Sequence, residues 1–358
     1  MNNKTKSLVL SGAAVALATP MSSALALDDV LSFGAWVNYN YNVDDDASED
    51  RFGDLDFESF NIYANHEHGD WFLDSEVRLG KGSFQGSGIS EQGSEATADR
   101  NVIGIKELAI GRHYGEEWTM TIGKTTVPFT YSRFNFWPGA RNMAGFDDQD
   151  GVGIRFDNDP VNTPFDMSLM FVKSQNFGNE TTSLDDGQRT FWGTDDTYHV
   201  MNTLVGDFGF TTGDFRHGVS VQAGQLADQD DTDEIEGHYA AGLYSEGTVG
   251  ALDLSAQFVH YDLDEVDGDV TQGSGQKAMV NVGTDVGSWY TYSDLSMSMP
   301  DSDIADDDQI DLVLGGRYNY GPGNIYVEVL LENLTDDEDV ETNDEFSQSI
   351  DLTMDYYF

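Results

Sequence analysis

Residues 347–358 read Ser-Gln-Ser-Ile-Asp-Leu-Thr-Met-Asp-Tyr-Tyr-Phe, and they carry the clearest strand pattern of the chain. Apolar residues occupy every second position, as Ile350, Leu352, Met354, Tyr356 and Phe358, while Asp351, Thr353, Asp355 and Tyr357 fill the others. Because successive side chains of a strand point to opposite faces, one face of this strand is apolar and the other is polar. A soluble edge strand shows the same period but seldom ends on two aromatics at that spacing. We therefore predict a strand between lipid and water.

The beginning of the chain has the pattern of an export signal. Lys4 and Lys6 precede an apolar run over residues 8–18, and Ala24-Leu25-Ala26 offers the small residues that a signal peptidase needs. The run is too short for a transmembrane anchor, because a helix needs about 20 apolar residues to cross a hydrocarbon core of roughly 30 Å. We predict a cleaved signal peptide over residues 1–26 and one domain over residues 27–358.

Composition narrows the class of protein. The 358 residues contain no cysteine, so disulfide bonds and thiolate metal sites are excluded. The formal net charge of -48 argues against nucleic acid as a partner, because phosphate binding needs the opposite sign. Aromatic residues make up 12% of the chain, which argues against disorder. We interpret the acidity as an adaptation to a saline habitat, where salt screens dense carboxylates.

Alternating hydrophobicity predicts sixteen strands in all, joined in turn by tight and by long connections. Tight turns are predicted at Gly69, Gly115, Gly247, Gly287 and 321–323, whereas the long connections are mostly acidic. Many of these strands have the length of about 9–11 residues that a tilted transmembrane strand needs, and only closure pairs every backbone group in lipid. We predict an all-β fold, a transmembrane antiparallel up-and-down β-barrel of 16 strands with a lumen wide enough for water.

One connection differs from the others. Residues 124–150, after the fifth predicted strand, carry six aromatics and little acid until Asp147, Asp148 and Asp150. A loop of this length in a compact domain needs a reason. We expect it to fold into the lumen and narrow the pore; a surface lid or a subunit contact is the alternative.

These features together resemble the general porins of Gram-negative outer membranes. The resemblance is carried by the layout of the whole chain, the strand Asp150-Gly-Val-Gly-Ile-Arg-Phe-Asp157 and the terminal Tyr356-Tyr357-Phe358. It implies a homotrimer in the outer membrane with both termini in the periplasm. It also implies that the barrel-assembly machinery recognises Tyr356 and Phe358. The Pro-Glu-Phe-Gly-Gly loop signature is absent, with Pro138-Gly139-Ala140-Arg141 nearest to it, which leaves Asp147, Asp148 and Asp150 as the expected acidic side. The dipeptides Gly123-Lys124 and Pro128-Phe129 resemble the corresponding sequence of phosphate-selective porins.

Charged residues give the candidate site. We expect the constriction to be formed by loop residues Lys124, Arg133, Arg141, Asp147, Asp148 and Asp150. Strand alternation points Arg78, Arg155, Arg216 and Arg317 into the lumen, while the alternation around Lys106 and Arg112 is ambiguous and assigns neither. Wall arginines opposite loop carboxylates would set up a transverse field; alternatively, they only neutralise nearby acids.

We predict a pore for passive diffusion of small hydrophilic solutes and ions, with weak cation preference because of the negative mouth. The alternative is an anion- or phosphate-selective porin that uses the basic cluster of residues 100–155. Catalysis is not expected, because the seven histidines are scattered and His66 and His68 sit at a turn. No cofactor and no specific metal site are expected, although the acidic external loops should bind Ca²⁺ or Mg²⁺ weakly and bridge to lipopolysaccharide phosphates. The expected partners are outer-membrane lipid, lipopolysaccharide and the assembly machinery.

Overall fold

The computed structural model describes residues 30–43, 53–80, 102–129, 133–136, 146, 149–160, 163–174, 198–228, 235–263, 274–300, 308–334 and 346–358. The predicted signal peptide and most of the long acidic connections lie outside these described residues. No helix in the described ranges is long and apolar enough to cross a membrane.

Strands make up most of the described chain. Their bounds are β1 Leu31–Asn42, β2 Asp54–Ala64, β3 His66–His68, β4 Trp71–Gly80, β5 Val102–Tyr114, β6 Trp118–Thr126, β7 Asp150–Asn158, β8 Phe165–Ser174, β9 Tyr198–Thr212, β10 Phe215–Asp228, β11 Ile235–Val249, β12 Leu252–Leu263, β13 Ser274–Val286, β14 Trp289–Pro300, β15 Gln309–Asn319, β16 Asn324–Glu332 and β17 Ser347–Tyr357.

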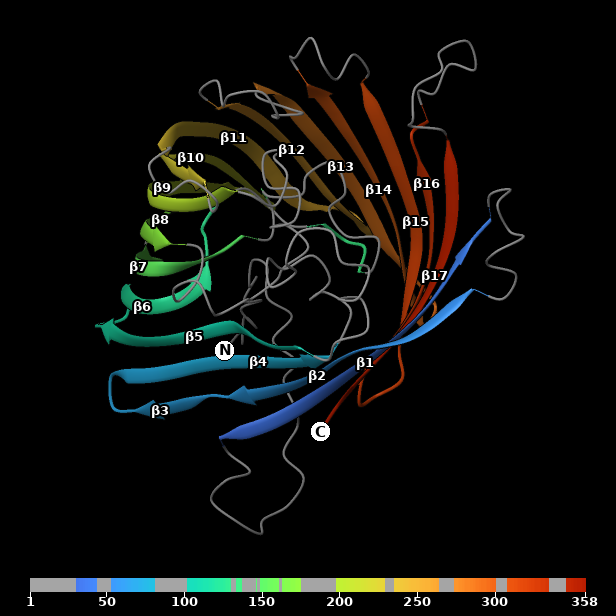
Figure 1. Cartoon of the computed structure of the whole chain (residues 1–358), viewed down its shortest axis with the longest axis horizontal. Coiled ribbons are helices and arrows are strands. Elements are labelled where there is room, and N and C mark those ends of the chain that lie inside the picture. Colours follow the sequence, from blue (N-terminus) through green and yellow to red (C-terminus); the bar gives the residue numbers. More distant parts are fainter. Residues whose placement is uncertain are drawn as a thin grey trace, which may run out of the picture.

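These strands close into one antiparallel barrel in which each strand pairs with its neighbours in the sequence (Figure 1). β2 and β3 are consecutive parts of one barrel strand, because only Asn65 separates them and both pair with β4. The barrel therefore has 16 strand positions, as the sequence predicts. β1 and β17 join through nine residue pairs, from Gly34–Tyr357 to Asn42–Ser349, so the sheet has no free edge.

The barrel is apolar outside and polar inside. In β17, Leu352 and Met354 are 43% and 44% exposed, whereas Asp351 and Thr353, which alternate with them, are 1% and 0% exposed. The same inversion recurs around the wall, and the buried polar side chains of the inner face include Asn38, Asn61, Ser220, Gln222, Ser255, Gln257, Asn281, Asp294, Ser296, Asp311 and Glu328. A water-soluble protein hides its apolar side chains. This barrel shows them to its surroundings, as a transmembrane barrel does.

The short connections lie at one end of the barrel. Gly69 and Gly287 have positive φ values of 63° and 66°, which suits tight hairpin turns because glycine has no Cβ to clash. The prediction for Gly247 was wrong, because β11 continues to Val249 and the turn falls at Gly250, with φ 67°. Val249 pairs directly with Leu252 across this turn.

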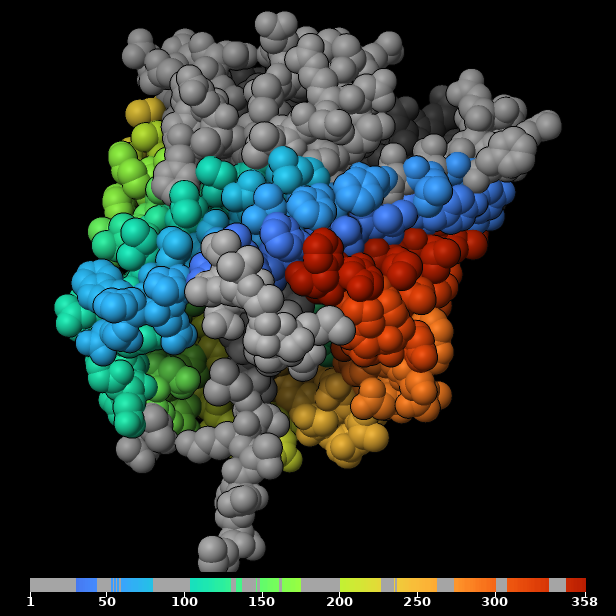
Figure 2. All heavy atoms as spheres, turned by 90° about the horizontal axis from the view of Figure 1, so that it is seen from below, coloured from blue at the N-terminus to red at the C-terminus, as the bar shows by residue number. Residues whose placement is uncertain are grey.

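The closing seam brings the two ends of the described chain together (Figure 2). The backbone N–H of Phe358 donates to the Phe33 carbonyl at 2.9 Å, and the Phe33 N–H donates to the Phe358 carbonyl at 2.8 Å. On the outer face the Phe358 ring stacks on Phe33, with centroids 5.5 Å apart, and lies 6.4 Å from the Phe60 centroid. The last residue thus joins strands from both ends of the sequence.

Candidate functional site: the loop-spanned lumen

The middle of the long connection between β6 and β7 is bound to the opposite wall of the barrel. Asp294 Oδ2 on β14 accepts hydrogen bonds from the backbone N–H of Phe134 at 3.1 Å and of Asn135 at 2.6 Å, and from Asn135 Nδ2 at 2.7 Å. Glu328 Oε1 on β16 accepts from the Phe136 N–H at 2.7 Å. Three consecutive amides therefore donate to two buried wall carboxylates. Because β14 is half-way round the barrel from β6, this segment crosses the lumen.

Aromatic rings reinforce this attachment. The Phe136 ring stacks on Tyr326, with centroids 4.6 Å apart and planes at 17°, and its neighbour Trp36 meets it edge-on at 5.4 Å. The Phe134 ring meets Tyr290 edge-on at 6.2 Å. Such offset and edge-to-face contacts are each worth about 0.5–1.5 kcal/mol beyond the burial of the rings. The tip of the described loop is thus held against β1, β14 and β16.

A second attachment lies on another part of the wall and is apolar. Phe129 and Phe146 lie on the inner face of strands β8–β13 in a buried cluster whose other members are Val127, Met170, Val172, Val200, Val205, Leu226, Ala240, Val259, Tyr261 and Met279. The buried Lys277 Nζ lies 5.6 Å from the Phe146 ring centroid and 5.7 Å from that of Tyr261. This part of the inner wall is therefore covered by apolar side chains of the loop.

Where the loop leaves β6, charged side chains gather on the inner wall. Arg78 Nε donates to Glu76 Oε1 at 2.7 Å, and Lys106 Nζ lies 3.1 Å from Asp150 Oδ2. Lys124 is only 1% exposed and lies within electrostatic reach of Asp150, Lys106 and Arg78. The Arg78 guanidinium also lies over the Trp36 ring, 4.8 Å from its centroid. We call Arg78, Lys106 and Lys124 the stem cations.

The predicted loop residues fall into three groups. Lys124 and Asp150 lie together at the stem of the loop. Arg133 lies on the far side, near Asp294, whose carboxylate it influences electrostatically. Arg141, Asp147 and Asp148 lie outside the described residues.

The predicted wall arginines all lie on inward-facing strand positions, and most have carboxylate partners. Arg155 Nη2 lies 2.8 Å from Asp157 Oδ1. Arg216 Nη2 lies 2.5 Å from Asp166 Oδ1 and 3.1 Å from Asp207 Oδ2. Arg317 lies over the Tyr290 ring at 5.2 Å. The pairing with wall acids fits the neutralising interpretation at Arg155 and Arg216, far from the loop tip.

Sequence reasoning missed Asp294, Glu328 and Trp36. All three occupy the inward phase of their strands, so the alternation that selected the arginines could also have selected them. Sequence alternation does not give the partner of an inward residue, since nothing in the sequence matches residues 134–136 to strands so distant along the chain.

The described residues contain no group of three or more His, Cys, Asp or Glu side chains arranged to hold a metal ion. The acidic external segments that were expected to bind Ca²⁺ or Mg²⁺ lie outside them.

A closed barrel with an apolar exterior, a polar interior and a loop across its lumen defines the class of transmembrane β-barrels. No family model matches the chain, and none of the curated proteins matches it in sequence. Solved structures do match. The chain is similar to OmpF of Salmonella typhi in complex with daunomycin, with 12% identity, a TM-score of 0.61, and coverage of 92% of this chain and 97% of that one.

Two further structures agree. A loop L8 deletion mutant of OmpT, an outer membrane protein of Vibrio cholerae, has 12% identity and a TM-score of 0.60 over 92% of this chain and 98% of that one. The anion-selective porin from Comamonas acidovorans has 14% identity and a TM-score of 0.58, with the same two coverages. At such identities the likeness shows the fold, which is that of outer-membrane porins.

Proposed function

We propose that this protein is an outer-membrane porin that forms a water-filled channel for passive diffusion of small hydrophilic solutes and ions. The observation that carries the proposal is the crossing of a polar lumen by residues 133–136, bound to Asp294 and Glu328. A purely structural barrel has no need for a loop held at this position. Catalysis is not part of the proposal, because the seven histidines are scattered along the chain.

The surroundings of the channel follow from the same proposal. Residues 1–26 act as a cleaved export signal, Tyr356 and Phe358 are read by the assembly machinery, and both termini face the periplasm. The barrel works as a homotrimer within lipid and lipopolysaccharide. Acidic external loops bind Ca²⁺ or Mg²⁺ weakly. If a chelator left the heat stability of the oligomer unchanged, this binding would not contribute to the assembly.

A weak preference for cations is the selectivity that we propose. The net charge is -48, and the inner faces of β14–β17 carry the carboxylates Asp294, Asp311, Glu328, Asp351 and Asp355. A lumen and mouth of one sign raise the local concentration of ions of the other sign. Small cations would therefore enter more readily than anions of the same size.

Preference for anions or phosphate is the second candidate, and the stem cations favour it. Lys124 lies within electrostatic reach of both Arg78 and Lys106, and like charges gather in this way at anion sites. Arg112 of the basic cluster does not contribute, because it lies on the outer face beside Trp71 and Tyr114. Glu76 and Asp150 oppose the effect, since each pairs with a stem cation.

Planar-bilayer recordings in a salt gradient separate the two candidates. The native protein is expected to give steady conductance steps and a reversal potential on the cation side. Arg78→Gln should shift the reversal potential further toward cation selectivity, because the Glu76 carboxylate loses its cationic partner. A unit charge in water is worth about 1 kcal/mol at 4 Å, so the cation-to-anion permeability ratio should rise by up to about fivefold.

The matched control is Lys173→Gln, which removes a lysine from the outer face of β8, where its Nζ bonds Asn202 Oδ1 at 2.6 Å. It should leave the reversal potential unchanged. A native reversal potential on the anion side would favour the second candidate, and the absence of any conductance would refute both.

A further inference from the structure

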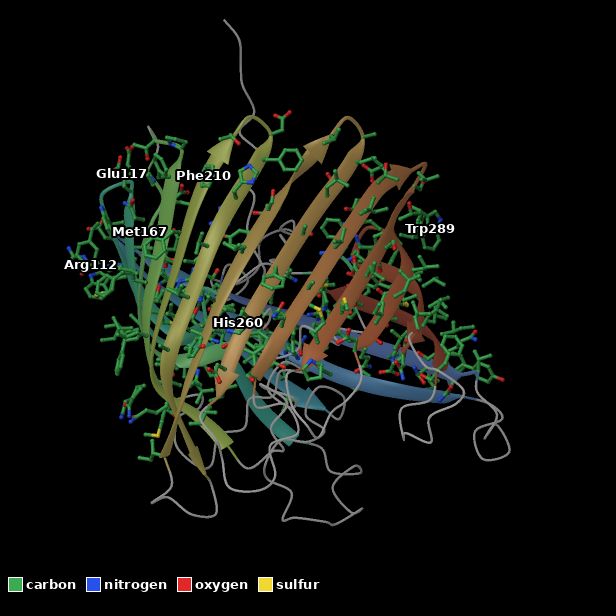
Figure 3. All side chains as sticks on the ribbon, turned by 90° about the horizontal axis from the view of Figure 1, so that it is seen from above. Arg112, Glu117, Met167, Phe210, His260 and Trp289 are labelled. Carbon is green, nitrogen blue, oxygen red and sulfur yellow. The ribbon has the colours of Figure 1, made fainter. Side chains whose placement is uncertain are left out.

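Arg112 is a cation on the lipid-facing side of the wall. It shares the outward phase of β5 with Leu108, Ile110 and Tyr114, which are 38%, 55% and 46% exposed. Two residues separate it from Gly115 in the β5–β6 turn, so it lies at the short-turn end of the barrel, and Figure 3 shows its side chain projecting away from the wall. A cation on the lipid-facing side of the wall is costly to expose to an apolar surface, and a negatively charged group bound to Arg112 would lower this cost.

The side chain is clamped by two aromatic rings. Its guanidinium carbon lies 5.3 Å from the ring centroid of Trp71, which is directly opposite on β4, and 4.9 Å from that of Tyr114. Both rings are about half exposed. Stacking on rings holds the guanidinium plane in place without using its N–H groups.

The N–H groups of Arg112 remain largely uncommitted among the described residues. Asp70 is the one carboxylate of the described chain within 4 Å, at 3.8 Å from Nη2, and its side chain is 68% exposed. Nε is buried and has no hydrogen-bond partner there. The result is a fixed donor fork at the boundary between apolar wall and water.

We propose that Arg112, Trp71 and Tyr114 form a binding site for the phosphate of a phospholipid in the leaflet beside the short-turn end. A phosphodiester accepts two parallel N–H bonds from arginine, which lysine cannot offer. Aromatic side chains of transmembrane barrels gather at the same depth as lipid headgroups, so the acyl chains of such a lipid would lie on the apolar surface that includes Leu108 and Ile110. The proposal rests on the membrane location proposed above, but not on conduction.

Native mass spectrometry of the full-length protein in detergent, titrated with phosphatidylglycerol, tests the site. The native protein should bind phosphatidylglycerol more tightly than diacylglycerol with the same chains. Because hydrogen bonds to charged groups are stronger than those between neutral groups, Arg112→Ala should weaken binding by at least about tenfold. Arg112→Lys should recover only part of the loss, and Lys173→Ala should bind as the native protein does.

The proposal would be overturned if Arg112→Ala bound phosphatidylglycerol as tightly as the native protein does, or if the native protein bound diacylglycerol equally well. It would also be overturned if Arg112→Ala dissociated the oligomer while lipid binding stayed intact, because the arginine would then contact a second copy of the chain. If Arg112→Ala fails to fold, Trp71→Leu with Tyr114→Leu keeps the cation, removes the clamp and should weaken binding several-fold. Bilayer conductance of Arg112→Ala should equal that of the native protein. Failure of the lipid-site proposal can therefore be distinguished from failure of the channel proposal.

Discussion

Replacing Asp294 and Glu328 together by alanine is expected to free residues 134–136 from the wall and to raise the single-channel conductance. Asp294 Oδ2 accepts three hydrogen bonds from the loop and Glu328 Oε1 accepts one. A hydrogen bond to a charged group contributes about 1.5–3 kcal/mol, so the loss amounts to several kcal/mol of docking free energy. The freed loop should fluctuate in the current path. Planar-bilayer recordings should show larger steps and more open-channel noise.

The control for this experiment is Asp355→Ala. Asp355 is also a buried inward carboxylate of the same wall, but its described partners include Asn324 rather than the loop. It should lower stability while leaving the unit conductance near the native value. If the double variant folds and conducts with native step size and noise, the contacts of residues 134–136 do not set the width of the channel.

Placing a charge on the outer face should destabilise the barrel strongly. Leu352 lies at the middle of β17 and is 43% exposed. On the surface of a water-soluble protein, Leu352→Arg would change the free energy of unfolding by no more than about 0.5 kcal/mol. At the centre of a bilayer the same change costs about 2–4 kcal/mol. Chemical denaturation in lipid vesicles measures the difference.

Leu352→Met is the matched control, because it keeps the surface apolar and changes the volume little. It should cost less than about 1.5 kcal/mol. A Leu352→Arg variant as stable as the Leu352→Met variant would mean that this face of β17 does not meet lipid.

Local patterns in the sequence predict most of the barrel. Period-two alternation specifies a strand and its wet face at once, so the sixteen strands and the inward phase of Arg78, Arg155, Arg216 and Arg317 follow from neighbouring residues alone. The turn at Gly250 was missed because Gly247 offers an equally good local signal, and only the pairing of β11 with β12 distinguishes them.

The ambiguity at Lys106 has a physical cause. The register between β4 and β5 shifts between Glu76 and Val77, which leaves Lys106 opposite no residue of β4. A bulge of this kind interrupts the alternation on which phase assignment depends. Lys106 consequently reaches Asp150, a contact that strict alternation does not predict.

The attachment of the loop lay beyond sequence reasoning for a different reason. The expected field had arginines on the wall and carboxylates on the loop. The described segment shows the opposite polarity, because backbone amides and Arg133 on the loop meet Asp294 and Glu328 on the wall. Backbone N–H groups are the same in every residue, so their use as donors leaves no trace in the sequence. The loop carboxylates Asp147 and Asp148 stay a prediction.

Ions are expected to pass through the lumen beside the loop stem, and the absence of cysteine from the chain allows a direct test. Val77 and Arg78 are adjacent on β4 but face opposite sides, with Val77 opposite Ile62 and Arg78 opposite Asn61. Single variants Arg78→Cys and Val77→Cys should be recorded in bilayers before and after a charged, membrane-impermeant thiosulfonate reagent is added. The current through Arg78→Cys should fall while that through Val77→Cys stays constant. Unchanged current through a conducting Arg78→Cys variant, or block of Val77→Cys alone, would mean that ions do not pass Arg78 inside the barrel.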